Sequence, residues 1–195
     1  MESEDTTPQG GVVLTFGGAV IAHATPVELD IAAVDPVSPE AASEAMARFA
    51  GLTDHPYPTC FACGVTRKDR DGLDLRPGPL RERPGTTATT WVPDATLAGA
   101  LDTADAGDNT VQAAAVWAAL DCPGGWAVDI PGRPLLLGRI TVQVDALPLI
   151  GERCTVMGAL LGRDGRKVHT ATTVYDEDGR ALARAAATWI ETTAR

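Results

Sequence analysis

The pattern of apolar and polar residues changes between residues 128 and 133, and this change separates the main elements of the chain. The stretch VQAAAVWAALDCPGGWAV, residues 111–128, is apolar almost throughout, as expected of a helix buried on most sides. Between residues 133 and 191, apolar residues instead recur at every second position, which is typical of strands. This part of the chain predicts strands at residues 135–147, 153–161, 167–176 and 181–191. We therefore expect one buried helix followed by an antiparallel sheet.

Two turns between these strands contain an Asp-Gly pair, which suits a tight hairpin because both residues tolerate positive φ. They are Asp164-Gly165 and Asp178-Gly179, each flanked by alternating apolar residues, and they predict two hairpins. In the last strand every second residue from Ala183 to Trp189 lies on one face, and most of these residues are alanines. Such small side chains leave room for the helix, so we expect this face to lie close to it.

The first part of the chain also alternates between strand and helix patterns. It predicts strands at residues 12–16, 19–31, 73–80 and 86–92, and a helix at residues 39–49. Gly17 and Gly18 join the first two strands and predict a hairpin, because glycine adopts positive φ freely. Ser38 is the expected cap of the helix, with Pro39 at its first position.

We divide the chain into an N-terminal β-hairpin and short helix, residues 1–52, and a main domain, residues 53–195. Residues 17–30 align without gaps on residues 178–191, which is a short internal similarity. Two interpretations of it stay open. The hairpin is a remnant of a second copy of the main fold, or the two segments are alike only because each is a glycine turn followed by a strand.

Composition and charge exclude several classes of partner. The net charge of -10 argues against nucleic acid, because no cluster of Lys and Arg is large enough to neutralise a run of phosphates. The sequence has no run of 18 apolar residues and no signal-peptide pattern, so we expect no membrane segment and a cytoplasmic location. The four cysteines are too scattered for a secreted disulfide framework, which fits a reducing compartment.

One carboxylate, Asp121, lies in the apolar helix. Ionising it in an apolar setting is costly unless it has a partner or a task. The same setting raises the pKa of a carboxyl group towards values that suit a general base. Asp121 is therefore our candidate catalytic residue, and the alternative is a hydrogen bond to the turn at residues 123–125. Trp117 lies four residues earlier on the same helical face, where it either walls an acyl pocket or packs in the core.

The CFACG motif supplies half of a zinc site, Cys60 and Cys63. His55 and Cys122 are the candidates to complete it, and such a site would fasten the irregular loop to the end of the helix. The alternative is that the motif contains two buried or free thiols. We expect that no cofactor is required, and the structural zinc stays an open question. A nucleophilic role for Cys122 is disfavoured because no histidine lies near it in the sequence.

The order of the elements, together with AALDCPGGWA and the segment from LLGRITVQVDALPL to RAAATWI, resembles the hotdog acyl-CoA thioesterases of the phenylacetate-pathway type. The stretches HPYPTCFACG and VWAALDCPGGWAV also resemble a group of actinobacterial thioesterase-like proteins. The resemblance covers residues 73–191. It implies an α+β hotdog fold, in which an antiparallel sheet wraps around a central helix, here with an N-terminal β-hairpin and helix extension. It also implies a homodimer.

In these thioesterases a helix carboxylate activates or orients water, and Asp121 is the matching position. Amides at the start of the helix polarise the thioester carbonyl. The corresponding residues here, expected to bind substrate together with Trp117, are Asn109, Thr110, Val111 and Gln112. The chain departs from the family at this point, because the usual His-Gly-Gly or similar glycine run is replaced by AGDNTVQAA.

The resemblance thus implies hydrolysis of an acyl-CoA or acyl-carrier thioester. Two alternatives stay open. The first is a non-catalytic hotdog module that binds an acyl ligand or a partner and has lost the oxyanion glycines. The second is hydration or dehydration of an acyl thioester, which requires a His and Asp pair that the sequence does not place.

Overall fold

A computed structural model describes residues 10–67, 71–99, 109–128 and 130–192 of the chain. The chain divides into two compact units, Met1–Asp30 and Ile31–Arg195, which are described separately. No helix among the described residues has the length and apolar content needed to cross a lipid bilayer.

The first unit contains the predicted hairpin, in which β1 (Val12–Phe16) pairs antiparallel with β2 (Ala19–Ala24). Gly17 and Gly18 have φ values of 58° and 80°, which confirms why glycine is needed at this turn. The second strand was expected to continue to residue 31 but ends at Ala24. Pro26 follows closely, and its missing N–H cannot join a strand ladder.

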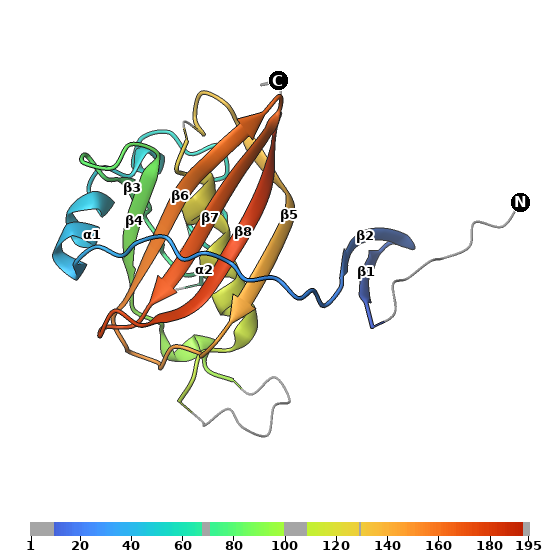
Figure 1. Cartoon of the computed structure of the whole chain (residues 1–195), viewed down its shortest axis with the longest axis horizontal. Coiled ribbons are helices and arrows are strands. Elements are labelled where there is room, and N and C mark those ends of the chain that lie inside the picture. The colour runs from blue at the N-terminus through green and yellow to red at the C-terminus, as the bar shows by residue number, and fades with distance from the viewer. Residues whose placement is uncertain (1–9, 68–70, 100–108, 129, 193–195) are drawn as a thin grey trace, which may run out of the picture. The chain divides into compact units, whose positions relative to one another are not determined.

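The second unit is built on one antiparallel sheet of six strands in the order β3-β4-β6-β7-β8-β5 (Figure 1). The strands are β3 (Gly78–Pro79), β4 (Thr86–Trp91), β5 (Leu135–Val144), β6 (Cys154–Asp164), β7 (Lys167–Tyr175) and β8 (Ala181–Glu191). The four strands expected after the helix are confirmed. The strand expected at residues 73–80 is reduced to β3, because Pro77 cannot donate to a ladder and Asp74 has a φ of 50°.

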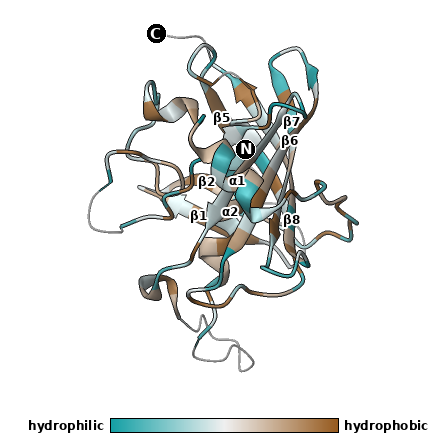
Figure 2. Cartoon of the chain, turned by 90° about the vertical axis from the view of Figure 1, so that its left-hand side faces the viewer, coloured by the Kyte–Doolittle hydropathy of each residue, from teal (hydrophilic) through white to brown (hydrophobic). Residues whose placement is uncertain are grey.

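The two Asp-Gly hairpins are also confirmed. Gly165 and Gly179 have φ values of 55° and 78° at the β6–β7 and β7–β8 turns. The charged residues of the β6–β7 turn are drawn in teal in Figure 2. These turns let three consecutive strands pair as neighbours, which makes the centre of the sheet.

Helix α2 (Ala113–Gly125) lies against the sheet behind β6, β7 and β8 in the view of Figure 1. Its residues that pack into the core are Ala115, Val116, Ala119, Leu120 and Cys122. On β8, the predicted small-residue face is confirmed, because alternate residues from Ala183 to Trp189 are buried in the same cluster. The predicted arrangement of one buried helix against one antiparallel sheet therefore holds.

The helix approaches the sheet closely because glycines lie at the contact. A Cβ atom added to Gly158 of β6 would collide with the backbone carbonyl of Pro123. A Cβ atom on Gly124 would come within 2.6 Å of the Thr170 hydroxyl oxygen. The Thr87 hydroxyl donates to the Pro123 carbonyl at 2.7 Å, so that this buried acceptor is satisfied. These contacts fix the end of α2 that carries Asp121.

Helix α1 (Pro39–Met46) covers the other face of the sheet. Ser38 caps it as predicted, with its Oγ accepting from the Ala41 amide at 3.3 Å. Ala42 and Ala45 pack in a second apolar cluster with residues of β4, β6 and β7. Helix α1 ends at Met46, three residues before the predicted end at residue 49, and a short 3-10 helix, Ala50–Leu52, follows. Because α1 packs on the sheet, it belongs to the second compact unit, which begins at Ile31.

Candidate functional site

Asp121 lies on the one side of α2 that the sheet leaves uncovered. Ala114 and Trp117 on this side are exposed, and Ala118 and Asp121 are half-buried. Their spacing of three and four residues places them on one helical face, here called the open stripe. Trp117 is 41% exposed, so it does not pack in the core of the chain. The open stripe is thus the face of α2 that the rest of the chain leaves accessible.

The environment of the Asp121 carboxyl group is unusual. Its Oδ1 atom is buried and has no hydrogen-bond partner among the residues that the structure describes. The residue Asp121 lines a cavity of about 170 Å³ whose other walls are mainly apolar and include Leu135, Leu137 and Trp189. Burial raises the pKa of Asp121 to about 6, and the nearby charge of Cys60 adds to the effect. At neutral pH the group is therefore ionised yet a stronger base than an exposed carboxylate.

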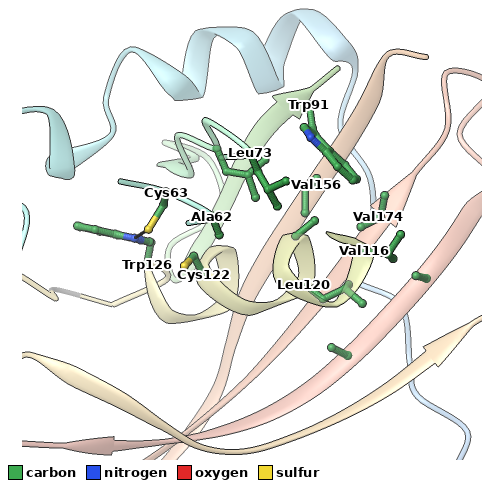
Figure 3. Packing of buried hydrophobic residues seen from close by; sticks show 14 of the residues in the cluster. Ala62, Cys63, Leu73, Trp91, Val116, Leu120, Cys122, Trp126, Val156 and Val174 are labelled. Atoms are coloured by element: carbon green, nitrogen blue, oxygen red, sulfur yellow. Dashed lines mark hydrogen bonds between the residues drawn. The ribbon is translucent and has the colours of Figure 1, made fainter. Parts of the chain in front are cut away.

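Three cysteines meet beside this carboxylate. The sulfur atoms of Cys60, Cys63 and Cys122, here called the thiol cluster, all lie within 4.8 Å of one another. The Cys60 and Cys122 sulfurs are 3.5 Å apart, and none of the cysteines forms a disulfide. Figure 3 shows the Trp126 indole N–H donating to the Cys63 sulfur, at 3.4 Å, next to Cys122 on the helix. The structure therefore brings the CxxC motif to the end of α2.

The electrostatics of the thiol cluster favour a single negative charge. Hydrogen bonds from Cys122 and then Cys63 lower the pKa of the Cys60 thiol. The bonds that Cys122 makes to Cys60 and Cys63, followed by its burial, raise the pKa of Cys122 well above its ordinary value. In the absence of a cation, one thiolate shared by hydrogen bonds is the state that these groups support.

His55 was the other residue predicted to complete a metal site with the CxxC motif. Its Nε2 donates to the carbonyl oxygen of Cys63 at 3.0 Å, and its Nδ1 accepts from the Tyr57 amide at 3.1 Å. Both ring nitrogens thus have partners, which makes Cys122 the residue that joins the pair. The imidazole packs edge-on against Trp126, with ring centroids 5.0 Å apart. His55 therefore supports the loop instead of contributing a ligand atom.

The CxxC loop is held in place by its backbone. The Gly64 amide donates to the Cys60 carbonyl at 2.9 Å, closing a turn around the motif. A Cβ atom on Gly64 would come within 2.5 Å of that carbonyl oxygen, so only glycine fits here. The amide of Leu75 donates to Ala62, and that of Leu73 donates to Phe61, each at 2.9 Å. These bonds position the sulfur atoms before any ligand arrives.

The residues whose amides were predicted to donate to the thioester carbonyl, 109–112, lie just before the start of α2. The amide of Val111 donates to the Pro148 carbonyl at 2.9 Å, and the amide of Gln112 donates to the Leu97 carbonyl at 3.0 Å. The Asn109 carbonyl accepts from the Ile150 amide at 2.9 Å, and Thr110 forms a β-bridge with Leu149. Two of the expected donor amides are thus already engaged by carbonyl groups of their own chain.

Solved structures match this chain, whereas no protein-family model and no curated protein sequence does. A thioesterase superfamily protein superposes with a TM-score of 0.53 and 20% identity, over 65% of this chain and 62% of that one. A phenylacetic acid degradation-related protein of Ralstonia eutropha JMP134 gives 0.50 and 15%, over 60% and 85% of the two chains. A Streptococcus mutans UA159 protein bound to acetyl CoA gives 0.50 and 12%, over 58% and 86%. The fold is that of the hotdog thioesterase superfamily.

The hotdog helix separates the two halves of the predicted site. Ala113 begins α2 and Asp121 is the ninth of its 13 residues. At 1.5 Å per residue the two positions are roughly 12 Å apart along the axis. A thioester group is much smaller than this, so the start of the helix and Asp121 of one chain cannot contact the same carbonyl. The cavity beside Asp121 is instead lined by Tyr57, a residue that no pattern in the sequence singles out.

Proposed function

We propose that this hotdog protein hydrolyses an acyl-CoA or acyl-carrier thioester and that Asp121 is the base that activates the attacking water. The observation that carries the proposal is Asp121 itself, a carboxylate on the open stripe that lines an apolar cavity and has one buried oxygen, Oδ1, without a hydrogen-bond partner among the described residues. Leaving such a group without a partner costs folding free energy. Activation of water would account for its presence.

The proposed reaction needs few groups. A carboxylate oxygen of Asp121 accepts a proton from water while the water oxygen attacks the thioester carbonyl carbon. The resulting tetrahedral intermediate then expels the thiolate, which gives the free acid and, after protonation, the thiol. Tyr57 is a residue that lines the same cavity, and we assign its hydroxyl to donate a hydrogen bond to the carbonyl oxygen. Nothing in this scheme requires an amide from the start of α2.

The size of the cavity favours a short or aromatic acyl group. Its volume is about 170 Å³. An apolar cavity of roughly 150 Å³ accommodates a benzene ring. We therefore expect turnover of acetyl-, propionyl- or phenylacetyl-CoA to exceed that of palmitoyl-CoA. That solved hotdog proteins are bound to acetyl CoA or coenzyme A supports CoA as the carrier.

A panel of acyl-CoAs tests the proposed function directly. Release of free CoA from short, aromatic and long acyl-CoAs is measured with a thiol reagent and compared with protein-free controls. Hydrolysis of at least one short or aromatic substrate well above the control supports the proposal. The binding-module alternative predicts no release from any of them, together with saturable binding of acyl-CoA in calorimetry.

We also propose that the protein forms a homodimer through β5. This strand is at one edge of the sheet, and its residues Leu136 and Leu137 are 54% and 39% exposed. An exposed apolar edge strand offers unpaired backbone groups and invites pairing with another copy. Leu135, Leu136 and Leu137 of β5 line the cavity beside Asp121, so a partner on this edge would approach the cavity.

Leu136→Glu is expected to convert the dimer to a monomer, because the substitution places a charge in an apolar interface. Light scattering coupled to size-exclusion chromatography measures the mass. Leu161→Glu is the matched control, since Leu161 is 64% exposed on β6, and two strands, β7 and β8, separate β6 from β5. A monomeric parent protein, or a Leu136→Glu variant that stays dimeric, would contradict this arrangement.

We propose a cytoplasmic location, because the four cysteines are too scattered in the sequence for a secreted disulfide framework and fit a reducing compartment.

A further inference from the structure

We propose that the thiol cluster binds one zinc ion through three thiolate ligands, and that the fourth coordination position faces the cavity that Asp121 lines. The proposal does not depend on the proposed hydrolysis. It rests on the placement of three sulfur atoms, on the rigidity of the loop that presents two of them, and on the cavity beside them.

The spacing of the sulfur atoms fits a tetrahedral ion. Zinc binds thiolate sulfur at about 2.3 Å, which places two sulfurs of one site about 3.8 Å apart. In the thiol cluster all three sulfurs are within 4.8 Å of one another, and one pair is at 3.5 Å. Small rotations of the side chains therefore suffice to surround an ion. The ligands come from two segments 62 residues apart in the sequence, so that tertiary folding has assembled the site.

The surroundings of the sulfurs resemble those of a bound metal. The turn closed by the Gly64 amide presents Cys60 and Cys63 from one rigid loop, as CxxC ligands require. The Trp126 N–H donates to the Cys63 sulfur, an outer contact that orients a ligand and stabilises its negative charge. These groups restrict the sulfur positions, which lowers the entropic cost of metal binding.

Charge explains why a cation belongs here. Without a cation the thiol cluster cannot lose all its protons, because three thiolates in one buried site would repel one another strongly in a medium of low dielectric constant. A divalent cation offsets most of that charge, so the remaining thiols release their protons as it binds. Soft sulfur ligands in a tetrahedral arrangement favour zinc over magnesium or calcium.

The number of ligands indicates an open site. Among the described residues only the three cysteines bring ligand atoms together in this way, and both nitrogens of His55 are engaged elsewhere. Zinc sites with three protein ligands keep a fourth position for water or another small ligand. All three cysteines line the 170 Å³ cavity together with Asp121, so we assign that position to the cavity side.

Metal analysis of protein purified without chelator and without a histidine tag tests the site. We expect about one zinc per chain in the parent protein, and a loss of more than ten-fold in Cys60→Ser, Cys63→Ser and Cys122→Ser. Cys154→Ser is the matched control and keeps its zinc, because Cys154 is a buried cysteine of β6 outside the thiol cluster. Asp121→Asn also keeps its zinc, so that failure of the proposed function is distinguishable from failure of the metal site.

Cobalt substitution tests the metal site in the parent protein, so the result does not depend on whether the cysteine variants fold. Co²⁺ added to reduced, metal-stripped parent protein is expected to give sulfur-to-cobalt absorption in the near ultraviolet and the intense visible bands of a tetrahedral ion. Imidazole should then shift the visible bands by entering the open position. A folded, reduced parent protein that holds no zinc and gives no cobalt spectrum would overturn the proposal. Zinc retained by Cys122→Ser would overturn the assigned ligands, and another metal at one per chain would overturn the assigned ion. Visible bands that do not shift with imidazole would overturn the open position.

Discussion

Asp121→Asn is expected to lower thioester turnover by about a hundred- to ten-thousand-fold, the usual worth of general-base assistance. The amide has nearly the shape of the carboxyl group, but it cannot accept the proton from water. The Michaelis constant should change much less, because the acyl group is held mainly by the apolar walls of the cavity. Steady-state kinetics on the best acyl-CoA of the panel measures both parameters.

The fold of the Asp121→Asn variant should be intact. Burial raises the pKa of Asp121 to about 6, so keeping the group ionised above that pH costs folding free energy. The amide has no such cost, and the melting temperature at neutral pH should stay equal or rise. Asp164→Asn, at the exposed end of β6, controls for a general effect of removing a carboxylate. Unchanged turnover in Asp121→Asn would remove this residue from the mechanism.

Gly158→Ala is expected to destabilise the protein by about 3 kcal/mol, at the upper end of the usual cost of overpacking. The added methyl group would collide with the backbone carbonyl of Pro123, which cannot move aside as a side chain would. The collision would push α2 away from the sheet and break the bond from Thr87 to that carbonyl. A change of this size corresponds to a fall of about 6 to 12 °C in melting temperature for a chain of this length.

Gly162→Ala is the matched control for this prediction. Gly162 lies in the same strand, and a Cβ atom there meets nothing within 4 Å. The melting temperature of the Gly162→Ala variant should therefore stay near that of the parent protein. Thermal unfolding followed by circular dichroism compares the two variants. Equal melting temperatures would mean that the contact between α2 and β6 is looser than the structure shows.

The fold was largely predictable because its signals are local. The apolar run of α2, the period of two in β5 to β8 and the Asp-Gly turns each depend on residues that are close in sequence. The departures occur where proline intervenes. Residues 73–80 have strand-like composition, yet Pro77 and Pro79 lack the N–H groups of a ladder, so only β3 remains.

The site was predictable only in its separate parts. Asp121 stands out in the sequence because a carboxylate is costly in an apolar helix, and Cys60 and Cys63 stand out by their spacing. Tyr57 and Trp189 carry no comparable signal. Their place in the cavity depends on how the loop and β8 pack around the end of α2.

The order of helix and strands, the hairpins and the residue types available for chemistry can be read from the sequence alone, because they follow from periodicity and local backbone preference. That Cys122 joins the CxxC motif while His55 binds backbone groups is visible only in the folded chain. The same holds for the place of Asp121 on the open stripe, roughly 12 Å from the start of its helix. Such contacts join residues far apart in the chain, and they are set by how closely glycines such as Gly158 let α2 approach the sheet.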